Sequence, residues 1–180
     1  MAKNIKTQKL THCALFSALL CICAPIAIPI GPVSVTLSLF AVMLTGIMLC
    51  INESIFATVV YILLGTFGLP VFSGAKGGFG IIIGPTGGYI WSYILAVIII
   101  SAICSIKFKS KKTQTAAAFL SCILGTAVCY LCGTLQYSSV TSTQFTKALS
   151  VCVVPFIPFD IIKAVCATAI AAALKSRLKM

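Results

Sequence analysis

The sequence predicts an all-α integral membrane protein, with six transmembrane helices in a single polytopic membrane domain that spans residues 1–180. One observation is the composition. Of all residues, 60% are hydrophobic and only 8% are charged, whereas a soluble domain carries about 25% charged residues. The other is the pattern, in which six apolar runs alternate with short polar, basic or glycine-rich segments. The net charge of +11 does not indicate nucleic-acid binding, because the basic residues cluster between apolar runs and do not cover a soluble face.

The first predicted span covers Leu10 to Ile30 and follows a basic tail. A basic start before an apolar core is also typical of a signal peptide, but more spans follow and no small-x-small cleavage site stands out. Within this span Ala14, Ser17 and Ala18 form a stripe of small residues. Such stripes let helices approach closely in lipid. This one predicts close packing, either inside the protein or against a partner.

The second and third spans are predicted at Val33–Ile51 and Ile55–Phe67, separated by Asn52–Ser54. Each run is shorter than the ~20 residues that cross a bilayer upright. Together they are too long for one span, so we interpret them as a tight hairpin of two helices.

A glycine-rich segment, Gly68–Gly88, follows the third span and contains eight glycines and two prolines. That composition disfavours a regular spanning helix, so we expect a long loop. It lacks the GxxxxGK[ST] pattern of a phosphate-binding loop. Phe72, Phe79 and the isoleucines near them argue against a disordered connector. The loop is therefore interpreted as a lid or binding loop.

The last three spans are predicted at Tyr89–Ile106, Ala116–Leu135 and Ala148–Leu174, with a polar Ser/Thr loop at Gln136–Lys147. Trp91 and Tyr93 stand near the outer end of the fourth span, a position that suits an aromatic belt.

Three basic clusters set the predicted orientation. They lie before the first span, between the fourth and fifth, and after the last. Basic segments mark the cytoplasmic side, and an even number of spans puts all three clusters on one side. Both termini are therefore predicted to be cytoplasmic, and the glycine-rich loop extracellular.

The most informative segment for function is Pro155–Lys163, which holds Asp160, one of only two acids in the chain. An ionisable group inside lipid costs at least ~2.5–3.5 kcal/mol on insertion scales and usually marks a substrate path or proton relay. Lys163 follows three residues later, on the same helical face. Counted from Ala148 at ~1.5 Å per residue, Asp160 is expected roughly 18 Å deep, near the membrane midplane. The alternative is an internal ion pair that only fixes helix packing.

Metal or redox chemistry is not predicted. Cys129 and Cys132 form a CxxC pair, but within an apolar helix they are better explained as two small residues one turn apart. The single histidine, His12, lies far from them in the sequence. We therefore expect neither a metal site nor a cofactor in this chain.

Two separate motifs, the glycine-rich loop and Pro155–Lys163, resemble in order and spacing those of the BioY family, the biotin-binding S components of energy-coupling factor (ECF) transporters. The first motif includes Gly68-Leu69-Pro70-Val71-Phe72 with Gly74-Ala75-Lys76-Gly77-Gly78, then Gly84-Pro85-Thr86-Gly87-Gly88-Tyr89; the second is Pro155 to Lys163. The resemblance covers nearly the whole chain. It implies a multi-pass protein of the bacterial cell membrane with six helices and cytoplasmic termini, which binds biotin from outside, under a loop.

The resemblance also implies partners. An S component docks on a transmembrane coupling subunit that carries two ATPase subunits, which hydrolyse the ATP. The small residues Ala14, Ser17 and Ala18 resemble the helix 1 motif used for that docking.

The residues suit biotin chemically, because biotin joins an apolar bicycle with a ureido group to a carboxylate. Asp160 can accept from a ureido N–H, and Lys163 can donate to the ureido carbonyl or to the carboxylate; both orientations stay open. Glycine permits close backbone approach, so the loop can bring N–H groups and an aromatic ring over the bicycle. The candidate binding residues are Asp160, Lys163, Gly77, Gly78, Phe79, Phe72, Gly84, Thr86 and Tyr89.

Two other function classes stay open. An intramembrane lipid-modifying enzyme would use Asp160 and Lys163 as acid and base, but such enzymes typically need further acids or a histidine in the site. Glu53, the only other acid, is expected at the opposite, cytoplasmic face. A transporter of another vitamin is the second alternative. We expect a binding protein and not an enzyme.

Overall fold

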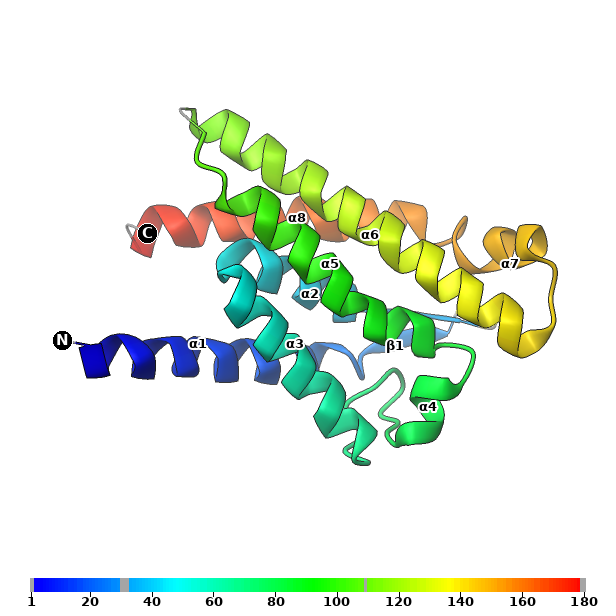
Figure 1. The fold of residues 1–180 in the computed structure, drawn as a ribbon. Coiled ribbons are helices and arrows are strands. Elements are labelled where there is room, and N and C mark those ends of the chain that lie inside the picture. The colour runs from blue at the N-terminus through cyan, green and yellow to red at the C-terminus, as the bar shows by residue number, and fades with distance from the viewer. Residues whose placement is uncertain (1, 30–32, 109, 179–180) are drawn as a thin grey trace.

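A computed structural model describes residues 2–29, 33–108 and 110–178 of the chain, mostly as helices (Figure 1). The helices are α1 (Ala2–Cys23), α2 (Ser38–Met48), α3 (Ile51–Thr66), α4 (Phe79–Ile83), α5 (Gly87–Ser105), α6 (Lys111–Thr141), α7 (Phe145–Cys152) and α8 (Ile157–Leu178). Strands β1 (Ala27–Pro29) and β2 (Ser34–Thr36) form a short antiparallel hairpin.

Length and hydropathy make this a multi-pass membrane protein. Within the described residues, three helices are long and apolar enough to cross a bilayer: α5, α6 and residues Ile157–Arg177 of α8. Three shorter apolar helices accompany them, at Thr7–Cys23, Ser38–Met48 and Ile51–Thr66. The prediction of a helical membrane protein is thereby confirmed, with the small hairpin as a departure from a purely helical chain.

The first predicted span is too long, because α1 ends at Cys23 and not at Ile30. Pro25 disfavours helical backbone at the residue before it. The β-branched residues beyond it favour extended structure, and Ile28 pairs with Val35 across the hairpin. The residues after α1 therefore form a hairpin instead of further helix.

The turn between the second and third predicted spans also lies elsewhere. Helix α3 begins at Ile51, so Asn52–Ser54 belong to its first turn instead of separating two helices. Glu53 is the acid of that turn, where the helix dipole favours negative charge. The Ser54 hydroxyl donates to the Cys50 carbonyl at 3.0 Å and occupies an acceptor at the helix start.

The predicted polar loop Gln136–Lys147 is largely wrong, since α6 continues to Thr141 and α7 begins at Phe145. Hydroxyls of this segment bond back to helical carbonyls, as in Ser139 to Leu135 at 2.9 Å. These bonds satisfy the polar side chains without leaving the helix.

The last predicted span is also interrupted. The chain leaves the helix at residues 153–156, where Pro155 lacks the N–H that a continuous helix needs. Asp160 therefore lies in the first turn of α8 and not deep within one long helix that starts at Ala148. The depth of 18 Å counted along such a helix does not apply.

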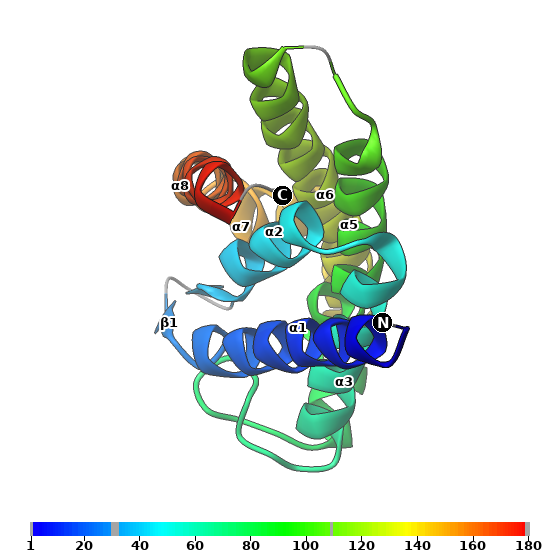
Figure 2. The ribbon, with the colours of Figure 1, turned by 90° about the vertical axis from the view of Figure 1, so that its left-hand side faces the viewer.

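Small residues allow the helices to pack closely. Helices α5 and α6 pack along each other, and a Cβ at Gly125 would lie 3.0 Å from Ile100 Cδ1. Helix α8 packs on α2, and its buried face includes Ala164, Ala167 and Ala171. Viewed along the molecule, α2 lies between α1 and α8 (Figure 2).

The two ends of the molecule differ. Both termini and the α5–α6 connection lie at one end, whereas α4 and α7 lie toward the other (Figure 1). The basic clusters thus share one end.

At the other end Trp91 is 40% exposed, but Tyr93 is 7% exposed and hydrogen-bonded to Ser38. The aromatic-belt interpretation is therefore wrong for Tyr93, which points into the interior.

Candidate binding site

A cavity of about 410 Å³ lies toward the end of the molecule away from the termini. Its volume is within the ~300–1,000 Å³ typical of small-molecule sites. Its lining comes from β2, α2, α3, the α3–α5 loop, α5, α6, α7 and α8. The lining residues are Val33, Ser34, Val35, Thr36, Ser38, Leu39, Tyr61, Ser73, Gly74, Lys76, Gly80, Ile81, Gly84, Pro85, Thr86, Tyr89, Ile90, Tyr93, Cys129, Tyr130, Cys152, Phe156, Asp160 and Lys163.

Asp160 and Lys163 form the charged part of this cavity. Lys163 Nζ donates to Asp160 Oδ1 at 2.6 Å. The Tyr130 hydroxyl, from α6, donates to Asp160 Oδ2 at 2.5 Å. Only 8% of the Asp160 side chain and 11% of the Lys163 side chain are exposed. Both carboxylate oxygens are thus held by protein donors, in the first turn of α8 where the helix dipole favours an anion.

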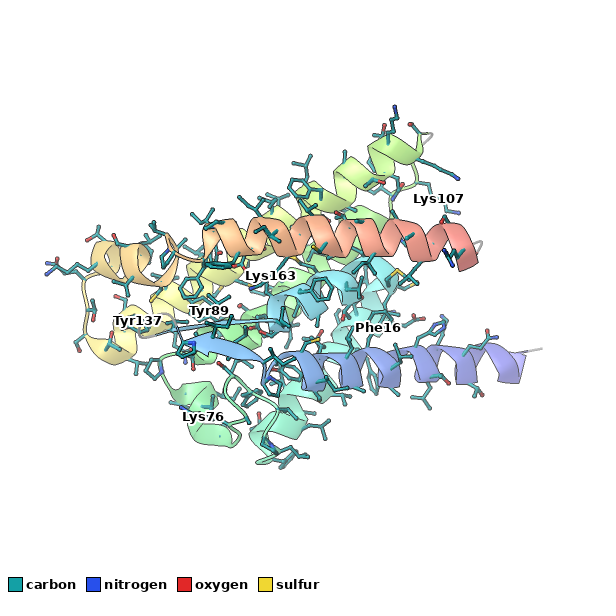
Figure 3. The ribbon with its side chains drawn as sticks, turned by 180° about the vertical axis from the view of Figure 1, so that it is seen from behind. Phe16, Lys76, Tyr89, Lys107, Tyr137 and Lys163 are labelled. Atoms are coloured by element: carbon teal, nitrogen blue, oxygen red, sulfur yellow. The ribbon has the colours of Figure 1, made fainter. Side chains whose placement is uncertain are left out.

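The pair keeps hydrogen-bonding capacity for a ligand. A lysine ammonium has three N–H donors, and a carboxylate oxygen can accept more than one hydrogen bond. Among the described residues Asp160 is the only acceptor for Lys163. Two N–H groups of Lys163 therefore remain for a molecule in the cavity, and Asp160 can accept a further bond from it. Figure 3 shows Lys163 and Tyr89 away from the end of the molecule that carries Lys107.

Hydroxyl groups from β2, α2 and α5 form a second polar part of the cavity. Ser38 and Tyr93 share a hydrogen bond of 2.7 Å between their oxygens, and Thr36 bonds Ser38 in turn. Hydroxyls both donate and accept, so these three hydroxyls can bind either a donor or an acceptor group of a ligand. The rest of the lining is mostly apolar, as expected for a small organic ligand.

Comparison with known proteins assigns the family. The model of the BioY family matches residues 1–180. The chain belongs to the BioY family.

Relatives of known name align with this chain over nearly their full length. The biotin transporter BioY2 of Lactococcus lactis subsp. cremoris is 37% identical over 172 residues, which cover 96% of this chain and 92% of the relative. The biotin transporter BioY of Thermotoga maritima is 38% identical over 168 residues, covering 93% and 96%. A crystal structure of the S-component for biotin from an ECF-type ABC transporter superposes with a TM-score of 0.84 at 26% identity, covering 98% and 95%. These matches agree with the BioY resemblance seen in the motifs.

The structure brings together some of the residues expected to bind a ligand in this BioY chain. Asp160, Lys163, Gly84, Thr86 and Tyr89 all line the cavity. The Tyr89 hydroxyl also donates to the Cys152 carbonyl at 3.4 Å, which links α5 to α7. These five residues come from two segments far apart in the sequence, and the fold assembles them around one space.

Two predicted aromatic contacts lie outside the cavity lining. Phe72 is fully buried and packs edge-on against Tyr61 of α3, with ring centroids 5.7 Å apart. Gly65 leaves the space for its ring. Phe79, on α4, is 62% exposed. Phe72 therefore anchors the loop to α3, and neither ring covers the cavity.

Gly77 and Gly78 also lie outside the lining and shape the loop itself. Gly77 packs against the Leu69 backbone so closely that no Cβ fits. Gly78 has a φ of 107°, which favours glycine, and its N–H donates to the Gly65 carbonyl at 2.7 Å. Close packing at Gly77 and the hydrogen bond of Gly78 therefore shape the loop, whereas the sequence had predicted ligand contacts for both residues.

The α1 stripe separates into two faces. Ala14 and Ala18 are exposed, whereas Ser17 is buried and donates to the Ala57 carbonyl of α3 at 2.9 Å. Ser17 thus packs inside the protein, and only the two alanines remain on an outer face.

Several cavity residues were missed by sequence reasoning. Tyr130, Tyr93, Ser38 and Thr36 sit in apolar runs or turns with no local motif. Lys76 was noted only as part of a motif, yet it lines the cavity as a second positively charged residue beside Lys163.

Among the described residues, no group of three His, Cys, Asp or Glu side chains lies close enough together to hold a metal ion.

Proposed function

We propose that this chain is the biotin-binding S subunit of an ECF-type transporter and takes part in biotin uptake. The observation that carries the proposal is the enclosed Asp160–Lys163 pair in a cavity of ligand size, in a chain whose relatives are biotin transporters. The similarity to an S-component for biotin supports the same function. The family places the chain with transport proteins and not with enzymes.

The cavity offers groups that match biotin. Lys163 presents two N–H donors, Asp160 presents acceptor capacity, and the Ser38–Tyr93 hydroxyls can do both. Gly84 and Thr86 bring the loop to the cavity edge. The apolar lining suits the bicycle. Binding would use charge-assisted bonds, which contribute about 1.5–3 kcal/mol each.

The proposed topology has six spans, α1, α2, α3, α5, α6 and α8, in one membrane domain over residues 1–180. Helix α2 has only 11 residues and rises about 17 Å, less than the ~30 Å hydrocarbon core. Nine of these residues are buried by the protein, so α2 does not need to cross lipid unaided. The basic residues at one end support cytoplasmic termini in the bacterial cell membrane.

The proposed partners are a transmembrane coupling subunit and two ATPase subunits that hydrolyse ATP. The chain has no phosphate-binding motif of its own. Ala14 and Ala18 on the exposed face of α1 are the proposed docking residues. Small residues there would allow another helix to approach the α1 backbone closely.

Equilibrium binding of labelled biotin to the purified chain tests the proposal. We expect saturable binding, release of unchanged biotin, and no competition from other vitamins at comparable concentrations. Conversion of biotin to a product would indicate an enzyme instead. Tighter binding of another vitamin would indicate a different transport substrate.

A further inference from the structure

The side chain of Gln136, on α6, connects three parts of the protein. Its Nε2 donates to the carbonyls of Ile82 and Gly84, each at 2.8 Å. Its Oε1 accepts from Trp91 Nε1 of α5 at 2.9 Å. The two carbonyls belong to the end of α4 and the residue after it, so one side chain of α6 joins the glycine-rich loop to α5.

This amide is fully used within the protein. A glutamine amide has two N–H donors and one oxygen. Here both donors serve loop carbonyls and the oxygen serves the indole. The three partners determine the positions of the amide oxygen and nitrogen, since a flipped amide would place its oxygen against two carbonyl oxygens.

Backbone packing holds the same part of the loop. Gly88 lies so close to α6 that a Cβ would be 2.6 Å from the Cys132 carbonyl oxygen and 2.8 Å from Gln136 Cβ. The Gly87 N–H donates to the Gly84 carbonyl at 3.1 Å. Figure 1 shows α4 beside the start of α5. We name residues 82–88 the anchored segment; Gly84, Pro85 and Thr86 of this segment line the cavity.

The tip of the same loop, residues 73–76, is held differently. Gly74, Ala75 and Lys76 are exposed, and Gly74 and Ala75 have φ values of 70° and 57°. An isolated antiparallel bridge between Phe72 and Lys76 closes the base of the tip, and in it the Phe72 N–H donates to the Lys76 carbonyl at 2.8 Å. No backbone N–H of Ser73, Gly74 or Ala75 donates to another described backbone group. Ser73, Gly74 and Lys76 nevertheless line the cavity. Few bonds would have to break for the tip to move.

We propose that Gln136 is a positioning residue that fixes the anchored segment as a permanent wall of the cavity, so that a biotin-sized ligand enters by movement of the tip alone. The inference rests on the proposed function for the identity of the ligand. The division of the loop into a fixed wall and a movable tip rests on the geometry alone.

Amide hydrogen exchange of the purified chain tests the division. Without biotin, the amides of the tip, residues 73–76, should exchange fast and those of the anchored segment, residues 82–88, slowly. Added biotin should slow the tip strongly and change the anchored segment little. Equal exchange of the two segments without biotin would overturn the inference. That comparison needs neither a variant nor a ligand, so it stands even if biotin does not bind.

The variant Gln136→Met keeps the side-chain length and removes both donors and the acceptor for Trp91, whereas Gln136→Glu removes the donors and keeps that acceptor. Both should raise exchange in the anchored segment and speed biotin release on the order of tenfold or more, because each loses the two hydrogen bonds to the loop carbonyls. Thermal unfolding in detergent should change little. Trp91→Phe removes only the indole donor and should have the smaller effect.

The matched control is Gln144→Met, at the exposed residue before α7, which should leave exchange and release unchanged. Unchanged release and exchange in both Gln136 variants, while the parent binds biotin, would overturn the role of Gln136 and leave the proposed function intact. Slower binding with lower thermal stability but unaltered release would also overturn it, since that pattern indicates a general folding role. Absence of biotin binding by the parent would instead contradict the proposed function.

Discussion

At the scale of single residues, the site depends on the partners that hold the Asp160 carboxylate within the protein. Lys163 neutralises it from the same helix, and Tyr130 holds its other oxygen from α6. An unpaired buried charge is costly, and removing one partner of a buried pair destabilises a protein strongly. The arrangement therefore leaves N–H donors of Lys163 available to a ligand in the cavity, while Asp160 and Lys163 stay paired in the unliganded protein.

The first prediction concerns the pair itself. Asp160→Asn and Lys163→Ala should each weaken biotin binding on the order of tenfold or more, because charge-assisted hydrogen bonds contribute about 1.5–3 kcal/mol. Equilibrium binding with labelled biotin measures this, and thermal unfolding in detergent reports any effect on folding separately. Glu53→Gln, at the other acid, is the control and should bind like the parent. If both site variants bind biotin like the parent, the ligand lies elsewhere.

The second prediction concerns Tyr130, which the sequence did not reveal. Tyr130→Phe removes only the hydroxyl that donates to Asp160. The carboxylate then keeps Lys163 but loses one fixed orientation, so biotin affinity should fall about tenfold or less. In the Asp160→Asn background the same change should have a much smaller effect, because the two groups act together. Equal effects in both backgrounds would contradict this coupling.

At the scale of elements, the glycine-rich loop is neither a regular span nor a floppy connector. Phe72 fixes its beginning to α3 and Gln136 fixes its end to α6. The helix α4 lies between these two anchors. The exposed tip carries Lys76 over the cavity, which makes the tip the natural place to observe ligand-dependent ordering.

The third prediction is that biotin protects the tip from trypsin. Cleavage after Lys76 needs an extended, accessible backbone, which the tip offers before it closes on a ligand. Added biotin should slow this cleavage severalfold. Lys147, exposed on α7 at the same end of the molecule, is the internal control, and its cleavage should not respond. Identical cleavage after Lys76 with and without biotin would show that the tip does not close.

At the scale of the whole molecule, the proposed binding site and the proposed docking face occupy different regions. The cavity is lined by residues of elements toward the end opposite the termini, whereas Ala14 and Ala18 are exposed on α1. In the proposed function, energy from ATP reaches the chain through contacts with the coupling subunit. A change at the α1 face should therefore separate binding from transport.

The fourth prediction follows from this separation. Ala18→Trp should leave biotin binding by the isolated chain intact but block both uptake and co-purification with the coupling subunit, because a large side chain prevents close helix approach in lipid. Ala172→Trp, at an exposed alanine of α8, is the matched control and should transport normally. Ser17→Trp should instead reduce stability, since Ser17 is buried against α3. Normal uptake by Ala18→Trp would place the docking surface on another helix.

The sequence alone determined the membrane character, the approximate spans and the charged pair. Apolar composition and the spacing of basic clusters follow directly from the cost of placing charge in lipid. The three-residue spacing of Asp160 and Lys163 predicts their contact, because helical neighbours at that distance share a face. The observed bond of 2.6 Å confirms that contact. Gly77 and Gly78 were predicted to bind the ligand, but they shape the loop and lie outside the cavity lining.

The tertiary structure decided what surrounds that pair. Tyr130 reaches Asp160, Tyr93 reaches Ser38, and Gln136 reaches the Ile82 carbonyl across sequence separations of 30 to 55 residues. Hydrophobic period and motif spacing describe one helix at a time and carry no information on which helices become neighbours. Neighbours are fixed by close packing of small residues and by satisfaction of buried polar groups. Those requirements are met only once the helices have assembled around the cavity.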